Sequence, residues 1–241
     1  MAATPAGRQL TEQHRRGQIA VRASVLRRLV ALWPLFDPAR IDESWRPLAT
    51  AVMAVVGQGR SDSAALAAAY YQAYRTAEGV PGPMPAVSTA PAAGWEAAAQ
   101  VAIEVTGPVR AKQLTALRRA DVAAQTLVSL SGAASRIALN GGRATVLTAV
   151  ERDPRAIGWA RVTDGSPCAF CAMLAGRGGV YSKRTVDFEA HDHCSCTSEP
   201  VYRDGALPGR GAEFAQLWRD STSGVESGQL LNAFRRAYEG R

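Results

Sequence analysis

Long apolar runs, histidine and lysine are all scarce in this chain. No stretch of about 18 or more consecutive apolar residues occurs, so no transmembrane helix is expected. The N-terminal segment MAATPAGRQLTEQHRRGQ also lacks the apolar core of a signal peptide. We therefore expect a protein that is made and kept in a reducing cytoplasm, where clustered cysteines favour a metal over disulfides.

Lysine occurs only as Lys112 and Lys183, although the chain has 28 basic residues and a net charge of +7. A basic surface can follow the phosphates of a nucleic acid. The arginines are, however, spread along predicted helices with Asp and Glu between them, so charge alone supports DNA binding only weakly. The candidate DNA contacts are Arg110, Arg118, Arg119 and Arg136.

Cysteine is also rare, and its distribution is uneven. All four cysteines and two of the three histidines lie within one short segment, as Cys168, Cys171, His191, His193, Cys194 and Cys196. Zinc is usually held by four thiolates or imidazoles in a tetrahedron, and a C-x2-C pair is the usual half-site. Six candidates exceed four positions. We prefer a structural zinc site made by Cys168, Cys171, His191 and either Cys194 or Cys196, with His193 as an extra candidate.

Three other interpretations of the same cluster remain open at this point. Disulfides could join the first cysteine pair to the second, the thiols could simply belong to a small core, or a Cys–His pair could act as a nucleophilic site. The segment 155–205 contains few large apolar side chains. Because a unit of about 50 residues seldom folds on so small a core, a metal or disulfides are often required. This favours a structural role for the cluster.

The pattern predicts a mainly α protein with a small α+β Cys/His module near the C-terminus. We divide it into a helical domain with a Pro/Gly-rich linker at 79–94, the module, and a C-terminal helical tail, at 1–154, 155–205 and 206–241. Helices are predicted at 8–33, 43–56, 61–77, 95–106, 109–139, 143–153, 168–174, 212–220 and 225–238. Short strands are predicted at 157–163, 180–181 and 197–202.

Three finer predictions concern the helical domain. In the first helix, the stripe facing the core consists of Ile19, Leu26, Leu29, Val30 and Trp33, whereas His14 is solvated. Glycines interrupt the second helix at 57 and 59, and Asn140, Gly141 and Gly142 end the long helix that precedes them. The aromatic side chains of Tyr70, Tyr71 and Tyr74 pack on a neighbouring element.

The module resembles the phage Mu F-like minor head protein family. The order and spacing of its motif are matched by Trp159 and Arg161, Thr163 and Asp164, Cys168 and Cys171, Leu174 and Gly176, Val180 and Tyr181, His191, Cys194, Cys196 and Pro200. The match covers about a fifth of the chain, and the HDHC form looks like the variant of actinophages. The resemblance implies a minor capsid protein acting in head assembly or DNA delivery.

The resemblance also implies partners and a location. The partners are the portal protein and the major capsid protein, with packaged DNA as a further contact. No contact with a membrane is expected, and the virion would hold several copies of the chain. The place is the head interior or portal vertex, after assembly in the host cytoplasm. Some relatives are labelled capsid maturation proteases, so the alternative is a protease with Cys168 or Cys194 as nucleophile and His191 or His193 as base. No GxSxG motif and no independent catalytic set occur, which disfavours an enzyme.

Overall fold

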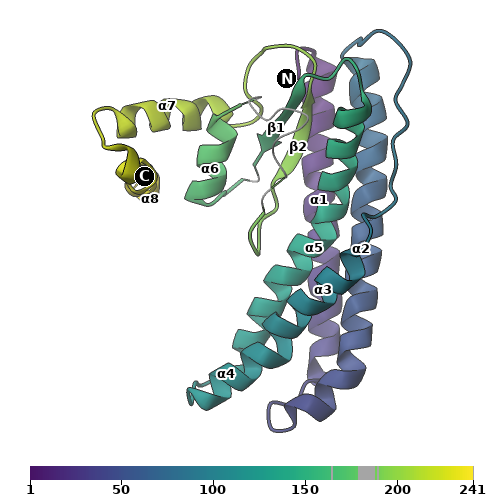
Figure 1. Ribbon diagram of the computed structural model, residues 1–241, viewed down its shortest axis with the longest axis vertical. Helices are drawn as coiled ribbons and strands as arrows, with labels where there is room; N and C mark the ends of the chain where they lie inside the picture. Colours follow the sequence, from purple (N-terminus) through teal and green to yellow (C-terminus); the bar gives the residue numbers. More distant parts are fainter. Residues whose placement is uncertain (164, 179–187, 189, 241) are drawn as a thin grey trace.

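Three long helices form an elongated bundle in the computed structural model, which describes residues 1–163, 165–178, 188 and 190–240 (Figure 1). They lie side by side as α1 (Pro5–Leu32), α2 (Ile41–Ala77) and α5 (Val122–Arg152). A short η1 turn (Trp33–Leu35) precedes α2. A further strip packs on the lower half of the bundle, as α3 (Trp95–Glu104), the π turn η2 (Val105–Val109) and α4 (Arg110–Ala116).

A small α+β unit lies beside the upper half of the bundle (Figure 1). Its strands β1 (Gly158–Val162) and β2 (Thr197–Val201) pair antiparallel, with Ala160 opposite Glu199. Beside them lie α6 (Ala169–Gly176), α7 (Gly211–Thr222), η3 (Ser227–Gln229) and α8 (Leu230–Glu239). The predicted fold class, mainly α with a small α+β Cys/His module near the C-terminus, is confirmed. The strand predicted at 180–181 lies outside the described residues.

The C-terminal helices pack on the module through one apolar cluster. Phe214 and Leu217 of α7 and Phe234 of α8 meet the alanines of α6. The Phe214 and Phe234 side chains are fully buried. The helices that follow β2 therefore cover one face of α6.

The buried face of α1 differs from the predicted stripe. It consists of Gly7, Thr11, His14, Gln18, Val21, Val25 and Leu29. Of the predicted positions only Leu29 belongs to it, and Val30 is 57% exposed. The prediction was wrong because polar side chains occupy core positions here and hide the helical period. Gln18 donates to the Ser63 carbonyl at 3.0 Å, and His14 is buried in a stack on Tyr70 rather than solvated.

The two longest helices are continuous where glycines were predicted to interrupt them. A Cβ at Gly59 would lie 2.5 Å from Val25 Cγ2, and a Cβ at Gly141 would collide with the Arg60 carbonyl oxygen. Gly142 brings its amide to within 2.9 Å of Ser63 Oγ. These glycines therefore serve close helix packing rather than helix termination. The predicted run 109–139 is instead divided at the turn after α4, where Arg118 and Asp121 have positive φ.

The connection from α2 to α3 begins at a buried ion pair. Arg75 pairs with Asp153 at 2.8 Å and also donates to the carbonyls of Val80, Pro81 and Gly82. Tyr70, Tyr71 and Tyr74 are buried, as predicted. The same arginine therefore ties the start of the Pro/Gly-rich segment and the end of α5 to the bundle.

Helix α5 is long and apolar enough, by length and composition alone, to cross a membrane. Its apolar window is 56% buried inside the fold. The core helix of a helical bundle has the same properties, since both need a long apolar surface.

Candidate metal centre

The first cysteine pair is positioned by the start of α6. Cys168 is the N-cap residue, and its sulfur accepts from the Cys171 amide at 3.4 Å. Because Cys171 lies in the first turn, both sulfurs point to the same end of the helix. The second pair, Cys194 and Cys196, comes directly before β2. Antiparallel pairing of β2 with β1 thus places the residues before β2 next to the residues after β1, at the start of α6.

The sulfur and imidazole atoms form two overlapping groups. Cys168, Cys171 and His191 form one, and Cys171, Cys194 and Cys196 form the other, with all ligand atoms of a group within 4.8 Å of one another. Cys171 belongs to both groups and is buried, whereas Cys168 and His191 are exposed. All four cysteines are free thiols, so no disulfide competes for them.

The spacings fit the edges of a zinc tetrahedron. With Zn–S bonds of about 2.3 Å and Zn–N bonds of about 2.0 Å, two sulfurs lie roughly 3.7 Å apart and a sulfur and a nitrogen roughly 3.5 Å apart. The observed Cys171 Sγ–Cys194 Sγ distance is 3.7 Å, and the Cys171 Sγ–His191 Nε2 distance is 3.5 Å. Cys168 Sγ is closer to His191 Nε2, at 2.9 Å. The donor set therefore suits zinc in its chemistry, and two of these three spacings match the edges of the tetrahedron, whereas Cys168 and His191 would have to move apart.

The other histidine of the segment faces a different element. His193 has a φ of 66° and lies against α5, where a Cβ at Gly132 would come within 2.6 Å of its Nε2 atom. Its neighbour Asp192 pairs with Arg136 at 2.7 Å. The structure therefore brings His191, not His193, to the sulfurs. Asp192 also neutralises the charge of Arg136, one of the four arginines predicted to contact DNA.

Electrostatics favour thiolates in part of the cluster. Hydrogen bonding with the Cys171 thiol, with further contributions from the Cys171 amide and His191, lowers the pKa of Cys168 to about 5. Hydrogen bonds from the Cys171 and Cys196 thiols, together with the Arg143 charge, lower the pKa of Cys194. Burial opposes protonation of His191, but the Asp192 carbonyl and the Cys168 sulfur raise its pKa overall. Hydrogen bonding with the Cys168 and Cys194 thiols raises the pKa of Cys171. Metal ligands must be deprotonated, so the lowered pKa values of Cys168 and Cys194 help binding, whereas the raised pKa of Cys171 opposes it.

The model of the VG15 protein family matches residues 6–220, most of the chain. The chain belongs to this phage-associated family. No curated protein matches the chain, and neither does any solved structure. The VG15 match runs through both the bundle and the module.

Two arginines of this VG15 family member are buried beside the cysteines; the sequence named Arg161 only as a motif position and did not point to Arg143. Arg143 of α5 and Arg161 of β1 are 4% and 1% exposed, and both guanidinium groups lie over the Phe188 ring. Arg161 Nη1 also lies 4.0 Å from Cys171 Sγ. The one available signal was an arginine directly after the glycine pair in an otherwise apolar stretch of helix. That signal does not reveal what the side chain contacts.

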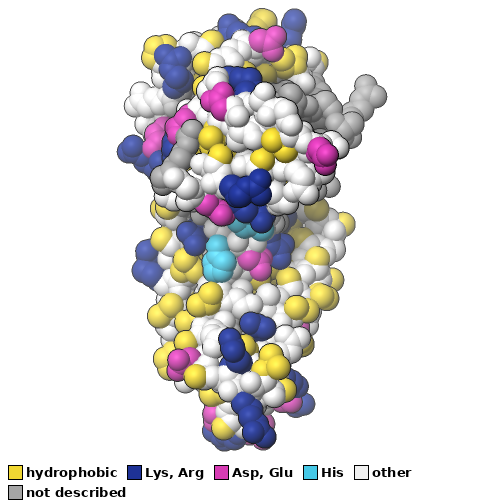
Figure 2. Space-filling view, turned by 90° about the vertical axis from the view of Figure 1, so that its left-hand side faces the viewer, with side chains coloured by type: hydrophobic (Ala, Val, Ile, Leu, Met, Phe, Trp, Pro, Cys, Tyr) yellow, Lys and Arg dark blue, Asp and Glu magenta, His cyan; other side chains and the backbone are white. Residues whose placement is uncertain are grey.

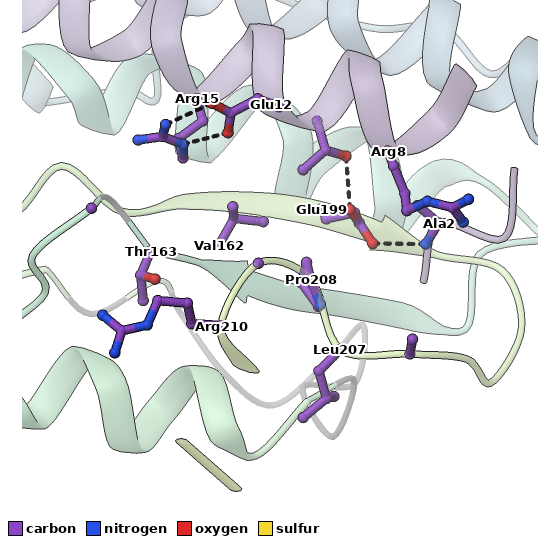
Figure 3. A pocket seen from close by; sticks show the side chains of 14 residues that line it. Ala2, Arg8, Glu12, Arg15, Val162, Thr163, Glu199, Leu207, Pro208 and Arg210 are labelled. Atoms are coloured by element: carbon purple, nitrogen blue, oxygen red, sulfur yellow. Dashed lines mark hydrogen bonds and ion pairs between the residues drawn. The ribbon is translucent and has the colours of Figure 1, made fainter. Parts of the chain in front are cut away.

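A separate cavity of about 410 Å³ lies between α1, β2 and the segment 206–210 (Figure 3). Glu199 at its wall accepts from the Ala2 amide and from Thr11 Oγ1, at 2.8 and 2.7 Å. Arg15 and Glu12 neutralise each other in a close pair. These polar groups are engaged with one another, and no histidine or cysteine lines the cavity. The metal centre is therefore the stronger candidate site.

Proposed function

We propose that the chain is a minor head protein of a phage, and that its Cys/His module is a structural zinc unit. Membership of a phage-associated family supports a role in phage biology. The finer assignment is supported by the Mu F-like motif, whose C-x2-C pair and H-x2-C-x-C segment meet in one cluster. Its partners are the portal protein and the major capsid protein, with packaged DNA as a further contact. Its place is the portal vertex or head interior.

The gathering of four other ligand side chains around Cys171 carries the structural part of this proposal. The bundle would supply an elongated surface for assembly, and zinc would stabilise the module beside it. When bound, zinc would supply a divalent centre for the thiolates and the imidazole. Cys168 and Cys171 would hold it from α6, and His191 with Cys194 or Cys196 from the segment before β2.

The test of the head assignment is quantitative mass spectrometry of purified virions and of heads without tails. We expect the chain in both samples, at a small fraction of the copy number of the major capsid protein. A Cys171→Ser phage should assemble fewer filled heads. Absence of the chain from purified particles would overturn the assignment. Unchanged head yield from the variant would remove the module from assembly.

One observation favours the protease alternative enough to test it. Cys168 Sγ lies 2.9 Å from His191 Nε2, and His191 Nδ1 lies 2.7 Å from the Asp192 carbonyl oxygen, as in a nucleophile, a base and an orienting group. Cys171 also lies close to His191 and belongs to a second group with Cys194 and Cys196. So many thiols near one imidazole favour a metal site over a catalytic pair. Cys168→Ser and Cys168→Asp, with zinc content measured in both, separate the two functions. Loss of major capsid cleavage with zinc and fold retained would establish the protease.

A further inference from the structure

One arginine of the bundle donates hydrogen bonds to the backbone of the candidate metal centre. Arg143 leaves α5 and donates from Nε to the Cys196 carbonyl at 3.0 Å and from Nη2 to the Cys194 carbonyl at 2.8 Å. Its Nη1 atom donates to Asn140 Oδ1 at 2.8 Å, which fixes the orientation of the guanidinium plane. The arginine therefore holds the backbone of the C-x-C segment at both cysteines.

The charge of Arg143 also has no carboxylate partner within the described part of the chain. A buried guanidinium is costly unless an anion compensates it. Among the described residues, the groups nearby that can become anionic are the thiols of Cys171, Cys194 and Cys196, and Arg161 lies close to Arg143 as a second positive charge. Zinc bound by three or four thiolates keeps a net negative charge, since each thiolate contributes one negative charge against the two positive charges of the ion. The arginine and the loaded centre therefore compensate each other.

One face of α5 contacts successive residues of the segment that carries the ligands. Gly132 makes room for His193, Arg136 pairs with Asp192, and Arg143 holds Cys194. The three helix positions are separated by four and seven residues, so they lie on the same face of the helix. The ligand segment is thus held by the bundle, and not only by the module to which its cysteines belong.

We infer that Arg143 is the positioning residue of the metal centre, and that it couples metal binding to docking of the module on α5. This inference rests on the zinc site proposed above. The metal would fix Cys194 relative to Cys171, while Arg143 fixes the Cys194 and Cys196 carbonyls relative to the bundle. Each interaction restricts the same short segment. Binding of the metal and docking on α5 therefore strengthen one another.

The test compares zinc affinity in the purified full-length chain and two Arg143 variants. Arg143→Met keeps much of the side-chain volume but removes the charge and both donors to the cysteine carbonyls. Arg143→Lys keeps the charge but cannot make the same fork of hydrogen bonds. In chelator competition we expect the Met variant to bind zinc about 10- to 100-fold more weakly, with Lys in between. The Co²⁺-substituted Met variant should also show an altered ligand-field spectrum.

Arg60→Met is the matched control. Arg60 is a buried arginine that donates to the Ile137 carbonyl at 3.2 Å and lies over the Trp95 ring, away from the cysteines. Its loss should lower stability without changing zinc affinity or the Co²⁺ spectrum. If Arg143→Met does not fold, Asn140→Ala replaces it. Asn140→Ala removes the hydrogen bond that orients the guanidinium plane. It should weaken zinc binding by about two- to fivefold, a smaller loss than that expected for Arg143→Met.

Hydrogen exchange then tests the coupling itself. Chelated wild type and zinc-loaded Arg143→Met should both exchange faster at 191–196 and in β2, whereas the amides of α2 should stay protected. Wild-type zinc affinity in both the Arg143→Met and Asn140→Ala variants would overturn the inference and leave the zinc site intact. A wild-type chain that binds no zinc would instead overturn the proposed site, and this inference with it.

Discussion

The bundle and the module solve the problem of stability in different ways. The bundle buries aliphatic side chains such as Leu48, Val52 and Leu130 along helices of 37 and 31 residues, and glycine residues let these helices pack closely. The module has short elements, and Trp159, Phe188 and three of its cysteines belong to one core cluster that also contains tyrosines of α2 and valines of α5. Where the chain turns often, too little apolar surface is available, so polar and metal-binding groups must contribute.

Metal removal should have the largest effect, and it should affect the module much more than the bundle. We expect chelation of the zinc-loaded protein to unfold or loosen the module while the bundle stays helical, because only the module depends on the ligand cluster. Far-UV circular dichroism should change modestly, since α1, α2 and α5 contain most of the helix, whereas limited proteolysis should cut rapidly between 158 and 202. Equal loss of helical signal from both regions would show that the bundle depends on the metal too.

Substitution of Gly141 should break the bundle without touching the ligands. In Gly141→Ala, the new Cβ would meet the Arg60 backbone oxygen, so α2 and α5 must move apart. We expect the free energy of unfolding to fall by about 3 kcal/mol, at the upper end for overpacking. Urea denaturation of the metal-loaded chain measures it.

Gly57→Ala is the control for this helix pair. A Cβ at Gly57 would make only an ordinary contact, 3.6 Å from Trp95. This substitution should raise stability by about 0.5–1 kcal/mol, because alanine favours a helix interior over glycine. A loss of stability similar to that of Gly141→Ala would show that backbone contact is not the reason for the glycines.

Protonation of His14 should make the stability of the bundle depend on pH. Burial lowers the pKa of His14 to about 4 from 6.5, so the unfolded chain binds more protons than the folded chain between these values. Stability from this group is complete above about pH 6.5 and is lost as the pH falls towards 4, by up to about 3 kcal/mol. His14→Phe should keep the stack on Tyr70 and flatten this part of the profile. Parallel profiles of wild type and variant would contradict the burial of His14.

The smallest effect should come from the ion pair on the surface between the two regions. Arg136 and Asp192 have side-chain exposures of 29% and 42%, so solvent screens their attraction. Arg136→Ala should lower stability by about 0.5 kcal/mol and should lose even this effect at high salt. Thermal melts at two salt concentrations measure it. A loss comparable to that of Gly141→Ala would make this pair a principal clamp between module and bundle.

The sequence predicted the helical class and the gathering of Cys168, Cys171 and His191 because composition and spacing carry this information locally. It could not predict that Gly141 lies inside a helix. A glycine that ends a helix and a glycine that admits another backbone look alike until the neighbouring helix is known. Arg143 was missed for the same reason, since its partners lie about 50 residues further along the chain.

The π turn at Val105–Val109 has a consequence for the register of the strip formed by α3 and α4. Buried positions recur every four residues at Ala99, Ile103, Gly107 and Ala111. In a straight α-helix, positions four residues apart are rotated by about 40° around the helix axis, so a four-residue repeat would soon turn away from the bundle. The wider turn takes up this drift, so Gly107 stays beneath the Trp45 ring. Deleting one residue from this turn would rotate all of α4 by about 100°, and Leu114 would face water.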